Sequence, residues 1–178
     1  MRGVALSVLD RLLEPLYGAT IVLSYTAPGY RVRARRFDPN DLRVDCRGRV
    51  AVVTGANAGL GRSVAQGLAE RGAEVILVCR NREKGEAARA GIATAAGNAR
   101  VHLEIADVAL LSDLSALMGR LRERTDRVDV LVNNAGVMLE ERELTSEGIE
   151  RSFATNVLGG YALTAALLPE LRRAGADA

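Results

Sequence analysis

The sequence predicts an α/β fold in which a doubly wound parallel sheet has strand order 3-2-1-4. Short apolar runs alternate with longer segments whose apolar residues recur at helical spacing, as expected when helices cover both faces of a parallel sheet. A glycine-rich turn follows the first apolar run, and an Asn-Asn-Ala-Gly block follows the fourth. Right-handed crossovers between parallel strands then give the order 3-2-1-4.

Each element follows from the local pattern. Runs rich in Val, Ile and Leu predict strands at residues 49–54, 74–79, 100–106 and 129–133. Helical periodicity predicts helices near residues 60–71, 82–96, 111–125 and 146–173. The last helix would end with Arg172, Arg173 and Gly175, since cations in a last turn followed by glycine are typical of a helix end.

The amino-terminal part is expected to be separate from this core. Leucines at helical spacing predict an amphipathic helix at residues 4–17. Mixed charge on its polar face favours packing on the domain, and a membrane-surface or partner helix is the alternative. The segment 28–39 carries four arginines and is expected to be a solvated connector. We therefore divide the chain into residues 1–41, a helix and an arginine-rich connector, and residues 42–178, the globular domain.

Composition excludes several classes of protein. A net charge of +2 is too small to indicate a nucleic-acid partner. No apolar stretch approaches the ~20 residues of a membrane span. Two cysteines, Cys46 and Cys79, make no disulfide framework and favour a reducing compartment, so we expect a cytoplasmic protein. We expect no metal site.

The glycine-rich turn predicts a dinucleotide site. Gly55, Gly59 and Gly61 follow an apolar strand and open an amphipathic helix, and that context distinguishes a binding turn from a structural one. Gly55 lets the backbone turn, Gly59 lets it approach a pyrophosphate, and Gly61 lets the helix pack closely. The helix, which begins near Leu60, directs N–H groups at the phosphates, and we include Asn57 of the turn among the binding residues.

The end of the second strand bears on the choice of cofactor. A site for NAD usually has a carboxylate ~20 residues after the glycines, where it holds the ribose 2′-hydroxyl. This chain has Cys79-Arg80-Asn81 there instead. A guanidinium can pair with a 2′-phosphate, so Arg80 and Asn81 favour NADP over NAD. A solvated surface arginine is the alternative interpretation.

Four motifs in order resemble the short-chain dehydrogenase/reductase family, whose fold is of the Rossmann type. They are Thr54-Gly55-Ala56-Asn57-Ala58-Gly59-Leu60-Gly61, then Asp107-Val108, then Asn133-Asn134-Ala135-Gly136, then Asn156. The resemblance covers residues 48–171, and the segment from Gly29 to Val50 resembles the leader of one subgroup. It implies that Asp107 and Val108 hold the adenine, that Asn134, Ala135 and Gly136 line the cofactor, and that Asn133 fixes the sheet.

The catalytic part of the family pattern is nearly absent. The family uses a tyrosine with a lysine four residues later, because a phenol of pKa about 10 needs a cationic neighbour near neutral pH. The one lysine here is Lys84, and no tyrosine precedes a lysine at that spacing. Of the family's catalytic tetrad only Asn156 has a match. The resemblance also implies a fifth strand after the last helix, so we expect a chain cut before that strand and inactive by itself.

Two functions remain open. The chain is either the amino-terminal part of a reductase that transfers hydride between NADP(H) and a small-molecule carbonyl or alcohol, or a non-catalytic nucleotide-binding or interaction module. In both cases the strand at 129–133 would be a sheet edge, and such an edge tends to pair with other chains. We therefore expect some homo-oligomer or aggregate.

Overall fold

The computed structural model describes residues 26–35, 37, 38, 40 and 43–175. The chain divides into two compact units, Met1–Val44 and Asp45–Ala178. In the first unit, α3 spans Ala27–Ala34. Part of the segment 28–39, expected to be a solvated connector, is therefore helical. Proline is tolerated in a first helical turn, and Arg31 and Arg33 lie in the last turn, where cations favour a helix end. The helix predicted at 4–17 lies outside the described residues.

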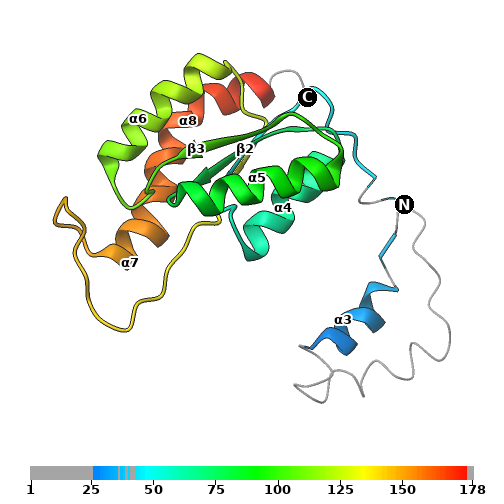
Figure 1. The fold of residues 1–178 in the computed structure, drawn as a ribbon, viewed down its shortest axis with the longest axis horizontal. Helices are drawn as coiled ribbons and strands as arrows, with labels where there is room; N and C mark the ends of the chain where they lie inside the picture. The colour runs from blue at the N-terminus through cyan, green and yellow to red at the C-terminus, as the bar shows by residue number, and fades with distance from the viewer. Residues whose placement is uncertain (1–25, 36, 39, 41–42, 176–178) are drawn as a thin grey trace. The chain divides into compact units, whose positions relative to one another are not determined.

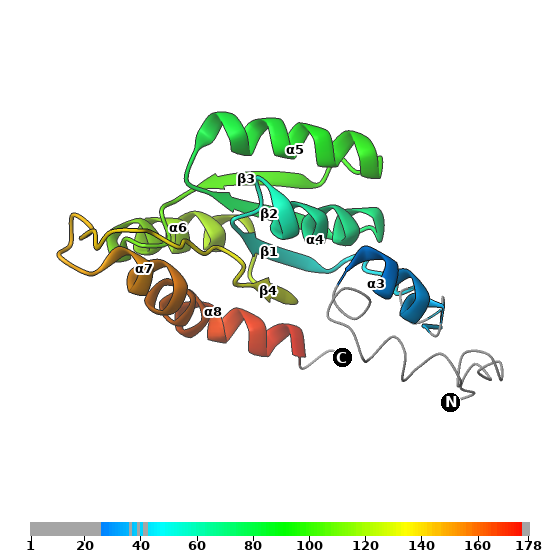
Figure 2. The same ribbon diagram turned by 90° about the horizontal axis from the view of Figure 1, so that it is seen from below.

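The second unit contains a parallel sheet of four strands. These are β1 (Val50–Thr54), β2 (Glu74–Cys79), β3 (Val101–Ile105) and β4 (Val130–Val132). Their order is β3-β2-β1-β4, which confirms the predicted topology (Figure 2). Val52 of β1 pairs with Ile76 of β2 on one side and with Leu131 of β4 on the other.

Helices cover both faces of the sheet. They are α4 (Gly59–Glu70), α5 (Arg82–Ala96), α6 (Leu111–Arg124), α7 (Arg151–Phe153) and α8 (Gly159–Gly175), with a π-helix, Ala154–Leu158, between the last two. Figure 1 shows α4 and α5 on one face and α6 and α8 on the other. Within the described residues, no helix is both long and apolar enough to cross a membrane.

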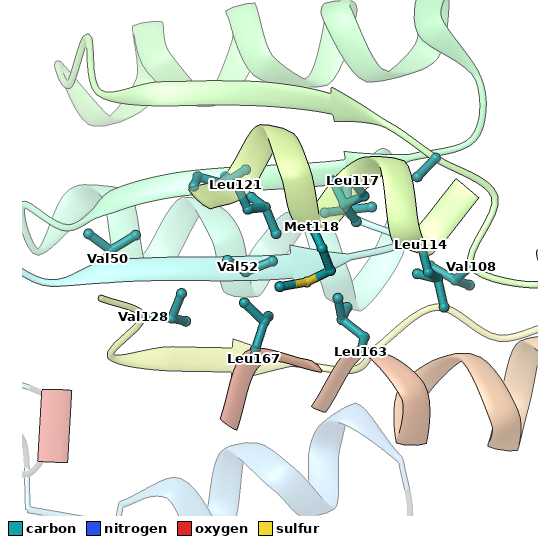
Figure 3. Close-up of a cluster of buried hydrophobic side chains, with 13 residues drawn as sticks. Val50, Val52, Val108, Leu114, Leu117, Met118, Leu121, Val128, Leu163 and Leu167 are labelled. Atoms are coloured by element: carbon teal, nitrogen blue, oxygen red, sulfur yellow. The ribbon is translucent and has the colours of Figure 1, made fainter. Parts of the chain in front are cut away.

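Two apolar cores follow from the alternation of side chains along β1. Val52 packs with α6 and α8, whereas Val53 packs with α4 and α5, and neither valine is exposed. Figure 3 shows Leu117 and Leu121 of α6 and Leu163 of α8 gathered around Val52. Burying a side chain of this size contributes about 1.5–3 kcal/mol, so the two cores hold the carboxyl ends of the strands in place.

The last helical segment begins later than predicted. Residues 146–150 form a turn, because the Thr145 hydroxyl accepts the N–H groups of Glu147 and Ile149, and Gly148 has a φ of +77°. The Glu150 carboxylate then caps the N–H groups of Ser152 and Phe153. The predicted helix over 146–173 was therefore wrong at its start, and a π-helix interrupts it. π-helical turns of this kind are frequent at functional sites.

The loop between β4 and α7 is attached to the start of α6. The Glu147 carboxylate accepts the N–H groups of Leu111 at 2.8 Å and Ser112 at 2.9 Å, and it also accepts the Ser112 hydroxyl. An anion at a helix N-terminus satisfies N–H groups that have no partner within the helix. These hydrogen bonds hold the pKa of Glu147 below its ordinary value of 4.5.

Candidate functional site

A cleft of about 200 Å³ lies at the carboxyl ends of the strands. Its lining brings together most of the residues that the sequence predicted for cofactor binding: Gly55, Asn57, Arg80, Asp107, Val108, Asn134, Ala135 and Gly136. Four further residues line it that the sequence analysis did not name: Val78, Ala106, Val137 and Thr155. Val78 and Ala106 lie at the ends of β2 and β3, so the rule that ligands bind at the carboxyl ends of parallel strands would have found them.

The remaining predicted residues lie outside this lining. Leu60 is 79% exposed in the first turn of α4. Asn81 is the N-cap of α5, where its side chain accepts the Lys84 N–H at 2.8 Å. Gly59 and Gly61 lie in the first turn of α4. Asn156 lines a smaller neighbouring cavity.

The two motif glycines in the first turn of α4 are required for different reasons. Gly59 has a φ of +55°, a backbone conformation that residues with a side chain rarely adopt. A Cβ at this position would meet no atom within 4 Å. A Cβ at Gly61 would lie 2.4 Å from Asn134 Nδ2 and 2.6 Å from Gly55 O. Gly61 therefore lets α4 begin directly against the turn.

The first turn of α4 has the character of an anion site. Its N-cap, Ala58, has no polar side chain, and no side-chain hydrogen bond caps this helix. Orphan N–H groups at a helix start bind phosphates and other anions well. The glycine turn and the uncapped helix thus lie together beside the cleft.

Thr54 and Asn134 join the glycine turn to the end of β4. The Asn134 N–H donates to Thr54 Oγ1 at 3.0 Å, and Asn134 Nδ2 donates to Thr54 O at 3.0 Å. The Ala135 N–H also donates to Thr54 Oγ1. The Asn134 side chain thus shapes the cleft mainly by fixing the backbone at Thr54. Asn133 instead donates from Nδ2 to Thr164 Oγ1 of α8 at 2.9 Å.

Asp107 is the acidic residue of the cleft lining, and it is held on several sides. Its Oδ1 accepts the Ala109 N–H at 3.0 Å. Its Oδ2 lies 3.3 Å from Arg151 Nη1 and 3.8 Å from Arg80 Nη1. Sequence analysis missed Arg151, because the contact joins residues 44 positions apart and no local pattern announces it.

Asn156 lies in the π-helix and faces the loop that follows β4. Its Oδ1 accepts the Val137 N–H and its Nδ2 donates to Val137 O, both at 2.8 Å. Close packing supports this segment, since a Cβ at Gly159 would lie 2.2 Å from Val108 O. Asn156 therefore fixes the main chain beside the cleft.

Comparisons with known proteins agree with this geometry. The family model for "short chain dehydrogenase" matches residues 49–177. The chain is 42% identical over 149 residues to "Dehydrogenase/reductase SDR family member 12" of Bos taurus, a match that covers 84% of this chain and 47% of the relative. The chain thus spans about half the length of the curated relatives it matches.

Solved structures share the fold. L-sorbose reductase from Gluconobacter frateurii, complexed with NADPH and L-sorbose, has a TM-score of 0.65 and 31% identity, covering 74% of this chain and 51% of its own. A 3-ketoacyl-(acyl-carrier-protein) reductase from Brucella melitensis, complexed with NADH, has a TM-score of 0.61 and 30% identity, covering 74% and 53%.

Proposed function

Because the chain belongs to the short-chain dehydrogenase/reductase family, we propose that its cleft binds a nicotinamide dinucleotide and takes NADP(H) in preference to NAD(H). The observation that carries this proposal is Arg80, which lines the cleft just after β2 ends. A guanidinium there suits a 2′-phosphate. The strand ends in Cys79 rather than in a carboxylate, and burial raises the pKa of the Cys79 thiol, so this side chain stays neutral.

The surroundings of the glycine turn fit the pyrophosphate of such a cofactor. The uncapped start of α4 offers N–H groups to an anion. Gly59 leaves open space where a side chain would otherwise project. A Cβ at Gly61 would instead collide with the turn itself, so that glycine serves packing.

The adenine and ribose would lie along the wall of the cleft that is opposite the glycine turn. We propose that the Asp107 carboxylate accepts the adenine amino group, with the Val108 backbone beside it. Asn134, Ala135 and Gly136 would then line the path toward the nicotinamide. Thr54 supports them, because its hydroxyl accepts the N–H groups of Asn134 and Ala135.

The bound cofactor would supply or accept a hydride, and the substrate class that we propose is a small-molecule carbonyl or alcohol. This chain's residues would bind and orient the cofactor. Asn156 would hold the Val137 backbone in place, since both polar atoms of its side chain are engaged there.

A second candidate function is a nucleotide-binding module without catalysis. The sequence contains no Tyr-x-x-x-Lys pair, and both candidate functions are compatible with that. Without a positioned proton donor, the oxyanion that forms during carbonyl reduction has little stabilisation. The two candidates share the cofactor site, and only the first includes hydride transfer by the complete protein.

Titration calorimetry with NADP⁺ and NAD⁺ tests the proposed cofactor. Arg80→Gln should weaken NADP⁺ binding by about 10- to 100-fold, the range for a charge-assisted pair, and should change NAD⁺ binding by less than about twofold. Arg82→Gln, a neighbouring exposed arginine outside the cleft lining, is the matched control. Equal losses for the two cofactors, or no binding by the wild type, would overturn the proposal.

A further inference from the structure

The Asp107 carboxylate lies between two arginines of different character. Arg80 Nη1 is 3.8 Å from Oδ2, and its side chain is 65% exposed. Arg151 Nη1 is 3.3 Å from the same oxygen, and its side chain is 22% exposed. Arg80 lines the cleft, whereas Arg151 lies outside its lining. One carboxylate oxygen therefore has a mostly buried partner outside the cleft lining and a mostly exposed partner within it.

Arg151 is held in place from its own side. It is the first residue of α7, and its N–H donates to Glu143 O at 2.9 Å. Its Nε lies 3.5 Å from Glu143 Oε2. The guanidinium is thus positioned between Glu143 and Asp107 by the loop geometry. A guanidinium that is already held in place loses less side-chain entropy on pairing than an exposed one does.

A competition follows from this arrangement. A half-buried carboxylate needs a compensating charge. Among the described residues, the cations that pair with Asp107 are Arg80 and Arg151. If Arg80 supplied that charge, its guanidinium would be drawn away from a cofactor phosphate. Arg151 can supply the charge without entering the cleft. The Asp107 Oδ1 is meanwhile fixed by the Ala109 N–H, so the carboxylate cannot simply turn away.

We propose that Arg151 is a positioning residue that sets the preference for NADP over NAD. It neutralises and orients Asp107 from behind, and this leaves Arg80 available to pair with the 2′-phosphate. The inference rests on the proposed cofactor site. It assigns the preference to a pair of arginines, of which only one touches the cofactor.

This role should change the ratio of the NADP⁺ and NAD⁺ affinities rather than either affinity alone. Arg151→Gln should lower the NADP⁺-to-NAD⁺ affinity ratio about three- to fivefold, the scale for a partly exposed charge pair. Arg151→Lys keeps the charge and should recover most of the ratio. Glu143→Gln is the matched control, because it removes the other partner of Arg151 and leaves Asp107 paired. An unchanged ratio in Arg151→Gln, or an equal fall in Glu143→Gln, would overturn the inference.

A crystal structure of ligand-free Arg151→Gln separates this inference from the proposed function. We expect the Arg80 guanidinium to close on Asp107 from 3.8 Å to hydrogen-bond distance. If the wild type binds neither cofactor, the proposed function fails, and this structure alone decides the arginine competition. An Arg80 side chain that stays at its present distance or moves away would contradict it.

Discussion

Thr54 and Asn134 are joined twice across the end of the sheet, once through the threonine hydroxyl and once through its carbonyl oxygen. Thr54 is only 2% exposed, and its hydroxyl also accepts the Ala135 N–H. One small side chain thus satisfies two backbone donors and sets the distance between the glycine turn and the loop after β4.

Thr54→Val should test this arrangement at nearly constant volume. The substitution removes the acceptor of the Ala135 N–H, and it leaves the Asn134 N–H with Val132 O as its remaining acceptor. We therefore expect a loss of about 1–3 kcal/mol in the free energy of unfolding. Denaturant titration measures this loss. The control is Thr164→Val, at an exposed hydroxyl of α8, which should cost under about 1 kcal/mol. Equal effects at the two positions would show that burial of the Thr54 hydroxyl has no special consequence.

Gly61→Ala and Gly119→Ala should change stability in opposite directions. A Cβ at Gly61 meets Asn134 and the Gly55 carbonyl, and overpacking of this kind costs about 1–3 kcal/mol or more. A Cβ at Gly119, within α6, meets nothing within 4 Å. Alanine there should stabilise by about 0.5–1 kcal/mol. Thermal unfolding of both variants checks the signs, and a stable Gly61→Ala protein would refute the packing role.

The attachment of Glu147 to α6 should make stability depend on pH in a defined direction. The pKa of Glu147 is lowered in the folded state, first by its backbone hydrogen bonds with Ser112 and Leu111. Its stabilisation is therefore fully present above the ordinary value of 4.5 and is lost as the pH falls through the lower folded pKa.

Glu147→Gln should accordingly lower the Tm at neutral pH, and the difference from the wild type should shrink as the pH falls below 4.5. Differential scanning calorimetry over that range measures it. Glu141→Gln, an exposed residue of the same loop, is the control. A difference that persists unchanged in acid would rule out a role for the charge.

Both candidate functions predict that the 178-residue chain is inactive by itself. We expect no steady-state oxidation of NADPH by the 178-residue chain with small aldehydes or ketones, because the sequence lacks a Tyr-x-x-x-Lys pair. Loss of NADPH absorbance is the measurement. Turnover that disappears in Asn156→Ala would contradict this expectation and show that the activity belongs to this chain.

Much of the fold could be predicted because its signals are local. β2 and α5 have the predicted bounds: an unbroken apolar run makes the strand, and Asn81 caps the helix that follows. The order of strands follows from crossover handedness. The start of the last helix could not be predicted in this way. Helical periodicity continues through residues 146–150, but the Thr145 hydroxyl and Gly148 divert the backbone there.

The same distinction between local signals and tertiary contacts applies to the candidate site. Gly55, Asp107 and Asn134 lie where strands end, so motif spacing predicts that they meet at one cleft. What each residue contacts depends on the tertiary structure. Asn134 is occupied by Thr54, and Arg151 approaches Asp107 from a helix distant in sequence. Spacing alone carries no information about such pairs.

The side chain of Asn156 acts toward Val137 as a neighbouring strand would, with one acceptor and one donor in register. The Val137 amide lies in a loop, but it is hydrogen-bonded as amides inside a sheet are, and such bonds protect against exchange with solvent. Deuterium should consequently replace the Val137 amide proton more slowly than it replaces those of its exposed neighbours. The exchange rate of that single proton would report, in solution, whether the π-helix that carries Asn156 is formed.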